Sequence, residues 1–185
     1  MATSTRRWTV DEVRALPTDA NRYEVIDGEL LVTPAPTYIH QEAVKLLLIR
    51  LDAYVLPNRI GVAKMAPADV ELTAGILVQP DVFVLPLVSG RKPRTWDETR
   101  RLLLAVEVLS AGAARLDRTV KRRVYQQHGV PEYWIADIDA AVIERWRPAD
   151  DRPEILAEEI VWQPDPAHEP LVIDLRSYFA EVIGE

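Results

Sequence analysis

The strongest hydrophobic pattern in the chain covers residues 102–110, LLLAVEVLS, where a nearly unbroken apolar run contains one carboxylate, Glu107. Runs of this kind are typical of strands that are buried on both faces. An ionised carboxylate in such a strand is costly unless it is paired, protonated or bound to a metal. Residues 118–129 follow with a basic, helical pattern, and Gly129 and Pro131 provide the expected helix stop. The pattern therefore predicts a buried acid followed by a basic helix.

The N-terminal part predicts a short helix and a β-hairpin. Residues 8–16 have a helical pattern, and Thr9 with Glu12 three residues later forms a capping box. Next, Asp27-Gly28 lies between two alternating segments in YEVIDGELLV, which is a strong signal for a two-residue hairpin turn. In that register Glu24 is on the face opposite Tyr23 and Val25, and the pattern alone favours a solvated position for it.

The middle of the chain predicts one long helix and two strand-like runs. A core-facing stripe indicates a helix from about residue 40 to residue 56, and its members are Val44, Leu47, Leu48, Leu51 and Val55. Residues 62–72 and 76–86 are strand-like and are joined by a turn at residues 73–75. In the second run, Asp81 begins an alternation that continues with Phe83 and Leu85. A further strand is predicted over residues 131–137, after the basic helix.

The C-terminal part predicts accessory strands. The candidates are residues 142–147, 154–162 and 171–175, and a final helix follows near residues 176–183. They could form an additional sheet or a cover. Trp146 and Trp162 indicate apolar surface that must be buried internally or against a second subunit.

The order of these elements predicts the fold class. From residue 40 onward the order is helix, strand, strand, strand, helix, strand, which indicates a mixed α/β fold with helices packed on a central sheet. We expect a single domain over residues 1–185, with a core at about residues 40–138 and accessory C-terminal elements at about residues 141–184. The chain contains no internal repeat or low-complexity segment.

Composition narrows the possible functions. The chain has 185 residues and no cysteine, which excludes thiol catalysis and thiolate metal sites. Its start lacks the apolar core of a signal peptide, and no apolar run is long enough to cross a bilayer, so we expect a cytoplasmic protein without a membrane partner. The net charge of −7 argues against a surface that is broadly adapted to nucleic acid. Basic residues nevertheless cluster in residues 91–101 and 115–123, either as solvated faces or as contacts to phosphate.

Three residues can be combined into one site. Asp81 and Glu107 lie on neighbouring predicted strands, and Lys121 lies on the helix that follows. Two carboxylates can hold a hard divalent cation such as Mg²⁺, which polarises a phosphate and lowers the pKa of an attacking water. A lysine can orient that water or neutralise developing charge.

Each of these features also has an ordinary structural explanation. Pro-Asp is a common turn signal. Glu107 could be a buried acid paired with an arginine, and Lys121 could be a surface lysine that pairs with Asp117 four residues earlier. The joint interpretation depends on their order along successive elements.

The sequence resembles the Uma-type endonuclease family within the PD-(D/E)XK nuclease superfamily. The resemblance covers nearly the whole chain, and the segments that carry it are YEVIDGEL, PAPTYIHQ, QPDVFV, VEVLS and DRTVKRRVYQQHGVPEYWIAD. The last segment is the most specific. The resemblance implies a restriction-endonuclease-like αβββαβ core, here with an N-terminal β-hairpin and C-terminal accessory strands.

The resemblance also implies roles for individual residues. Asp81 and Glu107 match the metal-binding acids, and the carbonyl of Val108 is a further candidate ligand. The superfamily usually places its lysine two residues after the glutamate, where this chain has Leu109. The Uma-type pattern supplies the lysine from the following helix, and Lys121 matches it.

Further positions match the family pattern less specifically. Glu24 and Asp69 are second-tier acidic candidates, and His40 matches a recurring histidine with no assigned role. Arg118 and Arg122 are candidate phosphate contacts. The chain departs from the pattern after VEVLS, where AGAAR replaces the usual Pro-Ser-Thr segment and changes the connection between strand and helix.

These observations lead to one principal expectation and two alternatives. The first is a Mg²⁺- or Mn²⁺-dependent endonuclease that hydrolyses phosphodiester bonds in DNA, acting as a homodimer. The second is a catalytically weakened nuclease fold that forms a dimeric binding or scaffold protein, which the acidic net charge and the altered segment favour. The third is a metal-dependent hydrolase of another phosphate ester, which would use the same residues.

Overall fold

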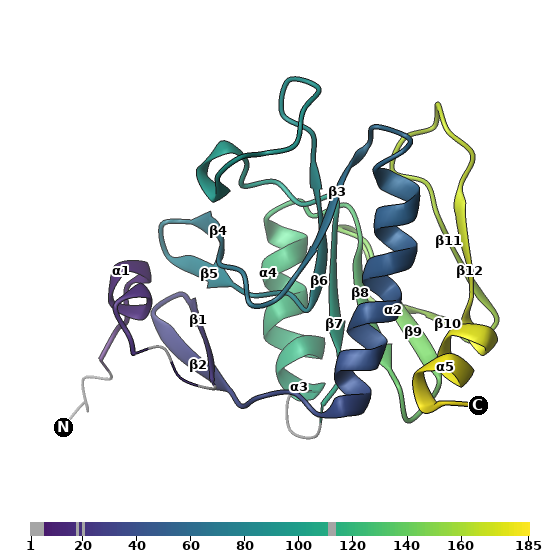
Figure 1. Cartoon of the computed structure of the whole chain (residues 1–185). Helices are drawn as coiled ribbons and strands as arrows, with labels where there is room; N and C mark the ends of the chain where they lie inside the picture. The colour runs from purple at the N-terminus through teal and green to yellow at the C-terminus, as the bar shows by residue number, and fades with distance from the viewer. Residues whose placement is uncertain (1–5, 18, 20, 111–113) are drawn as a thin grey trace.

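The apolar run around Glu107 forms the central strand of the protein. The computed structural model describes residues 6–17, 19, 21–110 and 114–185. In it the run becomes β7 (Leu104–Val108), whose residues are all buried, inside a six-stranded sheet (Figure 1). The predicted strand buried on both faces is confirmed.

The helices and strands follow the predicted order closely. The helices and single turns are α1 (Val10–Arg14), α2 (Tyr38–Val55), the 3₁₀ turn η1 (Trp96–Glu98), α3 (Ala114–Leu116), the π-helical turn η2 (Asp117–Lys121), α4 (Arg122–Gln127) and α5 (Leu175–Ile183). The six-stranded sheet has the spatial order β10 (Glu154–Leu156), β9 (Val142–Trp146), β8 (Tyr133–Asp137), β7, β6 (Val82–Pro86) and β3 (Gly61–Met65). A four-stranded sheet has the order β2 (Glu29–Thr33), β1 (Arg22–Ile26), β5 (Ile76–Val78) and β4 (Val70–Thr73), and β11 (Glu159–Trp162) pairs with β12 (Leu171–Asp174).

The central sheet is mixed, as the sequence predicts. Strands β3, β6 and β7 pair antiparallel, whereas β7 and β8 pair parallel. A parallel pair needs a crossover connection, and the helical segment α3–η2–α4 provides it. The order α2, β3, β6, β7, α4, β8 is the predicted αβββαβ core. The β4–β5 hairpin, which lies between β3 and β6 in the sequence, belongs to the four-stranded sheet instead.

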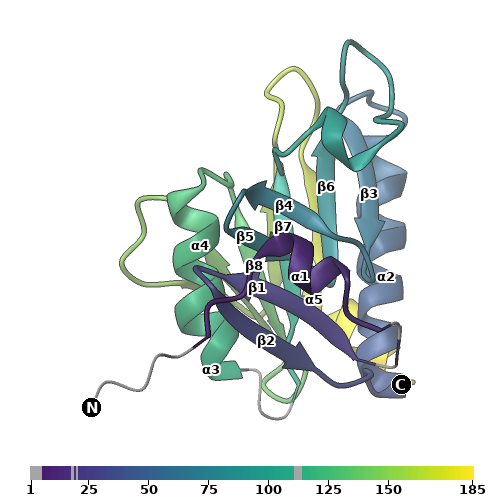
Figure 2. The same cartoon turned by 90° about the vertical axis from the view of Figure 1, so that its left-hand side faces the viewer.

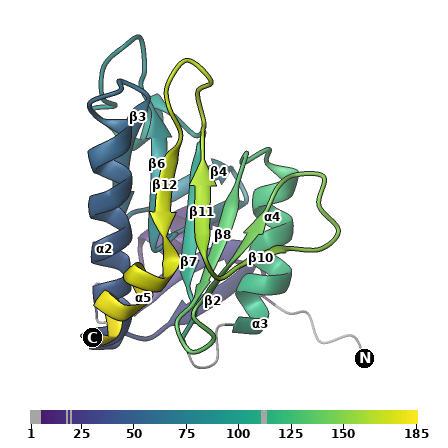
Figure 3. The ribbon, with the colours of Figure 1, turned by 90° about the vertical axis from the view of Figure 1, so that its right-hand side faces the viewer.

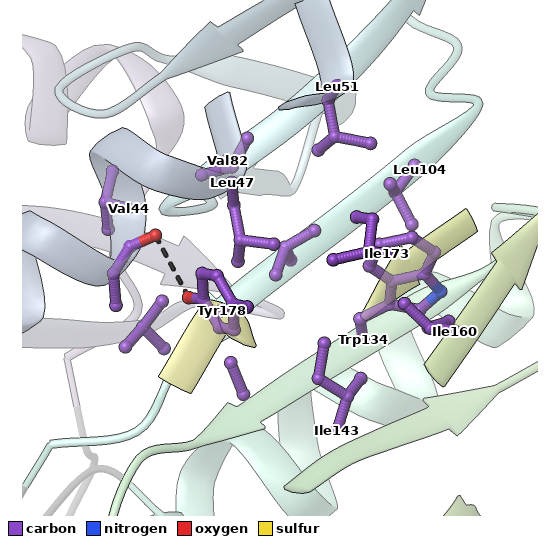
Figure 4. Packing of buried hydrophobic residues seen from close by; sticks show 14 of the residues in the cluster. Val44, Leu47, Leu51, Val82, Leu104, Trp134, Ile143, Ile160, Ile173 and Tyr178 are labelled. Atoms are coloured by element: carbon purple, nitrogen blue, oxygen red, sulfur yellow. Dashed lines mark hydrogen bonds between the residues drawn. The ribbon is translucent and has the colours of Figure 1, made fainter. Parts of the chain in front are cut away.

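One face of the central sheet is covered by α2, α5 and the β11–β12 ribbon (Figure 3). Alternate residues of β6, β7 and β8 point into this core, where Trp134 meets Trp162 in an edge-to-face contact with ring centroids 6.0 Å apart. Figure 4 shows Leu47 and Leu51 of α2 packing over the same strands. Trp146 and Trp162 are therefore both buried within the chain, at 7% and 2% exposure, whereas Val161 and Val172 on the outer side of the β11–β12 ribbon are exposed.

The opposite face is covered by α4 and the four-stranded sheet (Figure 2). Its core includes Phe83 and Leu85 of β6 and Ala105 of β7, so the predicted alternation that begins at Asp81 is confirmed. The hairpin between β1 and β2 also has the predicted register and turn, because Asp27 and Gly28 both have positive φ angles of 52° and 86°. The capping box of Thr9 and Glu12 is present at α1.

Three predictions about strands need correction. The run over residues 62–72 is divided into β3 and β4 around Pro67, and the run over residues 76–86 is divided into β5 and β6 around Pro80. Proline has no backbone N–H for a ladder, so each run leaves one sheet there and joins the other. Residues 154–162 likewise form two strands, β10 and β11, in different sheets.

Within the described ranges, no helix combines the length and the apolar composition that crossing a membrane requires.

We predict that Tyr178→Phe destabilises the protein without changing its site. The buried Tyr178 hydroxyl donates a 3.0 Å hydrogen bond to the carbonyl of Ala43 and so ties α5 to α2 (Figure 4). Its loss should lower the free energy of unfolding by about 1 kcal/mol in urea titrations. Tyr54→Phe is the matched control, because its hydroxyl donates to the carbonyl of Glu169 at an exposed position where water can replace it. Equal losses in both variants would contradict the prediction.

Candidate active site

The π-helical turn η2 directs one acid and one lysine into the protein. In this turn the amide of Arg122 donates to the carbonyl of Asp117, five residues earlier. Asp117 and Lys121 are both buried, whereas most side chains of this basic segment are not. Single π turns are rare within helices and are frequent at functional sites.

The ammonium group of Lys121 is surrounded by three carboxylates. Its Nζ atom lies 2.9 Å from Glu24 Oε2, 3.0 Å from Glu107 Oε1 and 3.8 Å from Asp117 Oδ1. These acids come from β1, β7 and η2, so one cation joins both sheets and the crossover segment. Glu24 is 2% exposed, and the prediction that it is solvated is wrong. The hairpin pattern could not show that the face of β1 that carries Glu24 packs toward the central sheet.

Neighbouring polar groups hold two of these carboxylates in place. The Tyr125 hydroxyl donates to Glu107 Oε1 over 3.2 Å, and the backbone amide of Gln79 donates to Glu24 Oε1 over 2.7 Å. Tyr125 is fully buried. Both oxygens of Glu24 and the Oε1 atom of Glu107 thus have donors, as buried polar groups require.

Asp81 is buried next to this group and has its own partners. Its Oδ1 atom accepts a 2.5 Å hydrogen bond from Nη1 of Arg22. Its Oδ2 atom accepts a 2.8 Å hydrogen bond from the amide of Val108 and lies 3.2 Å from Nε2 of His40. Because an ionised carboxylate can only accept, Nε2 of His40 is the donor in this pair.

The strand register brings Asp81 and Glu107 to the same place. Val82 pairs with Val106 in the antiparallel β6–β7 ladder, and one further step along this register sets Asp81 opposite Glu107. Directly opposite residues point to the same face of a sheet with their Cβ atoms about 5 Å apart. The structure therefore brings together Asp81, Glu107 and, through Glu107, Lys121.

Burial and charge shift the pKa values of the acids in opposite directions. Burial raises the pKa of Glu107 well above its ordinary value, and nearby carboxylates add to this although Lys121 opposes it. Burial also raises the pKa of Asp117 to about 6. For Asp81, burial acts in the same direction, but the hydrogen bond from His40 and the charge of Arg22 lower its pKa to about 2.

The pKa of Lys121 is shifted by the same neighbouring acids. Burial lowers the pKa of Lys121, but Glu107, Glu24 and Asp117 together raise it above its ordinary value. Lys121 therefore stays charged because three carboxylates surround it. Glu107 has a raised pKa because it is buried and shares the charge of Lys121 with Glu24 and Asp117.

The site carries more negative than positive charge. We call it the acidic cluster, and its members are Glu24, Asp81, Glu107, Asp117, Arg22 and Lys121. When all six side chains are ionised and His40 is neutral, the cluster has an excess of two negative charges. Protons or a divalent cation can balance that excess.

The donor set of the cluster fits a hard divalent metal ion. Carboxylate oxygens are the ligands that Mg²⁺ and Mn²⁺ prefer, and Asp81 and Glu107 offer them from adjacent strands. Within the residues that the structure describes, no three acidic or histidine side chains already form a ligand group. The carboxylates are instead bonded to Arg22 and Lys121, which a metal ion would have to replace in part.

Three hollows lie in this part of the protein. The smallest, of about 190 Å³, is lined by Arg22, His40 and Asp81. It shares Pro67 with a hollow of about 900 Å³ and shares His40 with one of about 710 Å³. Asp81 thus borders the smallest hollow, whereas Glu107 and Lys121 line none of the three.

Several predicted site residues lie outside the acidic cluster. Asp69 accepts from the side-chain amide of Gln79 and pairs with Arg14, and it lines the largest hollow. Arg118 pairs with Asp137 and Glu144, and Arg122 lies over the ring of Trp146. Both arginines therefore already have internal partners.

The remaining sequence predictions concern the connection after β7. The amide of Val108 contacts Asp81, and its carbonyl as a metal ligand stays a prediction. Leu109 packs against the hydrophobic core, in agreement with a lysine that comes from the helix. Ala111, Gly112 and Ala113 of the AGAAR segment lie outside the described residues.

Sequence reasoning missed Arg22 and the part played by Asp117. Arg22 opens a hairpin strand, and nothing in its surroundings in the sequence marks a residue that bonds to an acid 59 positions later. Asp117 was visible only as a helical partner of Lys121, because the π turn that buries both side chains has no sequence signal here.

Comparisons with known proteins agree with this description. The model of the Uma2 family, described as "Putative restriction endonuclease", matches residues 10–176. A solved structure of a "putative nuclease belonging to DUF820" from Anabaena variabilis is similar, with a TM-score of 0.72 and 21% sequence identity over 95% of this chain and 99% of that one. At this identity the structural likeness concerns the fold. A comparison with curated proteins found no match.

We predict that Asp117→Asn stabilises the metal-free protein at neutral pH. The pKa of Asp117 rises from 3.8 to about 6 on folding, so its protonated form favours the folded state and this contribution is lost as the pH rises through 6. An asparagine at this position is neutral at every pH and avoids that loss. The free energy of unfolding of Asp117→Asn should exceed that of the wild type by on the order of 1–3 kcal/mol at about pH 7.5, and the difference should vanish near pH 4.

Urea unfolding in the presence of a chelator at both pH values measures this difference. Asp151→Asn, which changes an exposed acid, is the control and should have no effect. An Asp117→Asn variant that is less stable than the wild type at both pH values would show that the prediction is wrong.

Proposed function

The chain belongs to the Uma2 family, and from that premise we propose that it is a metal-dependent endonuclease that hydrolyses phosphodiester bonds in DNA. The observation that carries the proposal is the buried acidic cluster, in which four carboxylates face two cations and Lys121 lies 3.0 Å from Glu107. When all of these groups are ionised, the excess of two negative charges is complementary to one divalent cation.

The proposed roles follow from the contacts of each side chain. Asp81 and Glu107 hold Mg²⁺ or Mn²⁺, and the carbonyl of Val108 adds a ligand. When bound, such an ion polarises the scissile phosphate and lowers the pKa of the attacking water. Lys121 orients that water and neutralises charge that develops on the phosphate. Glu24 and Asp117 keep the Lys121 ammonium charged and fixed in direction.

A nucleic-acid substrate is supported by the residues that line the hollow next to the one at Asp81. The largest hollow is lined by Arg14, Lys64 and Arg94 together with the indole of Trp96, which is 46% exposed. Basic side chains bind phosphates, and an exposed aromatic ring can stack on a base. Arg118, which lines the hollow on the other side, and Arg122 are proposed as further phosphate contacts.

Two further properties are proposed on general grounds. A homodimer would supply two sites for the two strands of a DNA duplex. A cytoplasmic location agrees with a chain without cysteine.

We predict that the purified protein nicks or linearises plasmid DNA in Mg²⁺ or Mn²⁺. Asp81→Asn and Glu107→Gln keep the size of each side chain but remove a metal-binding charge, so gel assays should show a loss of at least about a hundredfold in each variant. Asp151→Asn should cleave like the wild type. Equal residual cleavage in all four proteins would show that the proposal is wrong.

A second candidate function is a nuclease-like fold that has become a binding or scaffold protein. The observation that favours it is the set of internal partners, because both Asp81 and Glu107 are bonded to protein cations.

A calorimetric titration with Mn²⁺ discriminates between the two functions. For the endonuclease we expect one site with a micromolar Kd, which Glu107→Gln weakens by about tenfold or more. The absence of any specific heat of binding, together with an inert protein in the plasmid assay, would favour the scaffold.

A further inference from the structure

Arg22 forms an ion pair with Asp81 beside the small hollow, which both residues line. It is the first residue of β1, and its side chain is 16% exposed. Its Nη1 atom bonds to Asp81 Oδ1, while His40 and the Val108 amide use the other carboxylate oxygen. Both carboxylate oxygens of Asp81, the proposed metal ligand, are therefore already hydrogen-bonded. Among the described residues, only Arg22 donates to Oδ1.

The Nε atom of Arg22, unlike its Nη1 atom, has no hydrogen-bond partner among the described residues. This atom is buried. Buried donors in folded proteins are almost always satisfied, so this N–H indicates an acceptor such as a water or a ligand oxygen. Arg22 borders the small hollow next to Asp81, whose lining combines polar residues such as Asn21, His40 and Gln41 with apolar ones such as Val44 and Pro67.

The chemistry of the guanidinium identifies the class of acceptor. Its N–H groups form a planar fork that matches two oxygens of a carboxylate or a phosphate. In the structure only one N–H of the fork is used on Asp81. A tetrahedral phosphodiester group in the hollow would offer non-bridging oxygens to the remaining N–H groups, beside the proposed metal ligand.

Resting on the proposed function, we propose that Arg22 exchanges Asp81 for the substrate phosphate when a divalent cation binds. A cation on Asp81 competes with the guanidinium for the same oxygen and repels it. Because Arg22 already borders the hollow, its guanidinium can turn into the hollow and bind a phosphodiester oxygen there. Arg22 then acts as a positioning residue that blocks the metal ligand in the free protein and holds the phosphate in the loaded one.

This exchange predicts opposite effects of one substitution on two binding equilibria. In Arg22→Gln the competing charge is gone, so the Kd for Mn²⁺ in calorimetry should fall by about tenfold. The affinity for a short labelled DNA duplex, measured by fluorescence anisotropy in Ca²⁺ without cleavage, should instead weaken by about tenfold, because a charged contact to phosphate is lost. Without a divalent cation, the duplex should bind the wild type and Arg22→Gln equally.

Two further variants make the result decisive. Arg50→Gln is the matched control, since it breaks the 2.7 Å ion pair with Glu181 away from the cluster and should change neither affinity. Arg22→Lys keeps the charge but not the fork. It should leave Mn²⁺ affinity near that of the wild type while reducing duplex affinity in Ca²⁺ by several-fold, and it carries the test if Arg22→Gln does not fold.

The outcomes separate this inference from the proposed function. If the wild type binds Mn²⁺ but Arg22→Gln binds it more weakly, or retains full duplex affinity in Ca²⁺, Arg22 only supports Asp81 and the exchange is wrong. If the wild type binds little Mn²⁺ and Arg22→Gln binds it well, the exchange is supported strongly. If neither binds Mn²⁺, the metal-dependent function itself is wrong and the exchange fails with it.

Discussion

The ion cluster around Lys121 is the interaction on which the rest of the structure depends. One buried ammonium lies within 4 Å of carboxylates from β1, β7 and η2, and so connects the four-stranded sheet, the central sheet and the crossover segment. Breaking a buried ion pair by removing one partner leaves an uncompensated charge, which is far more costly than the pair itself is stabilising. Any arrangement of these three elements must therefore keep Lys121 close to its acids. The π turn is the local distortion that makes this possible.

The same cluster is a poor solution for stability alone. Its carboxylates outnumber its cations, and the raised pKa values of Glu107 and Asp117 show that the folded protein tolerates their charge at a cost. Hydrophobic residues of similar volume would hold these elements together equally well. Proteins commonly accept such costs where a binding site needs unbalanced charge. Arg22 and His40 reduce the cost at Asp81, the acid that borders the small hollow, and this explains why its pKa moves downward while the pKa values of Glu107 and Asp117 move upward.

The two hydrophobic cores on either side of the central sheet determine where the acidic cluster lies. Alternate residues of β6 and β7 fill one core against α2 and α5 and a second core against α4 and the four-stranded sheet. Asp81 and Glu107 continue the second set of positions, at the end of the strand pair where the ladder stops. The β11–β12 ribbon covers the opposite face, so the accessory C-terminal elements support the core without approaching the acids. β7 is thus buried on both faces, while Asp81, at the end of the β6–β7 pair, borders the small hollow.

The sequence alone determined most of the local structure and the order of the elements. The apolar run of β7, the Asp27-Gly28 turn, the capping box of Thr9 and the stripe on α2 are signals within short segments, and each was confirmed because its physical cause is local. The pair Asp81 and Glu107 could be placed on neighbouring strands for the same reason. The division of two strand runs at Pro67 and Pro80 was not foreseen, because a proline shows where a ladder stops but not which sheet the chain joins next.

Only the tertiary structure decided the electrostatic character of the site. Glu24 appears solvated in its hairpin pattern, yet it is buried against Lys121, almost a hundred positions later in the chain. Arg22 gives no sign in the sequence of its bond to Asp81. Burial and pairing depend on which surfaces meet, and charges that are distant in sequence alter one another's pKa only after they meet. The opening segment, a buried acid followed by a basic helix, contained two members of the site, and the sequence also indicated Asp81 and, less specifically, Glu24. Only the fold showed that Arg22 and Asp117 join them.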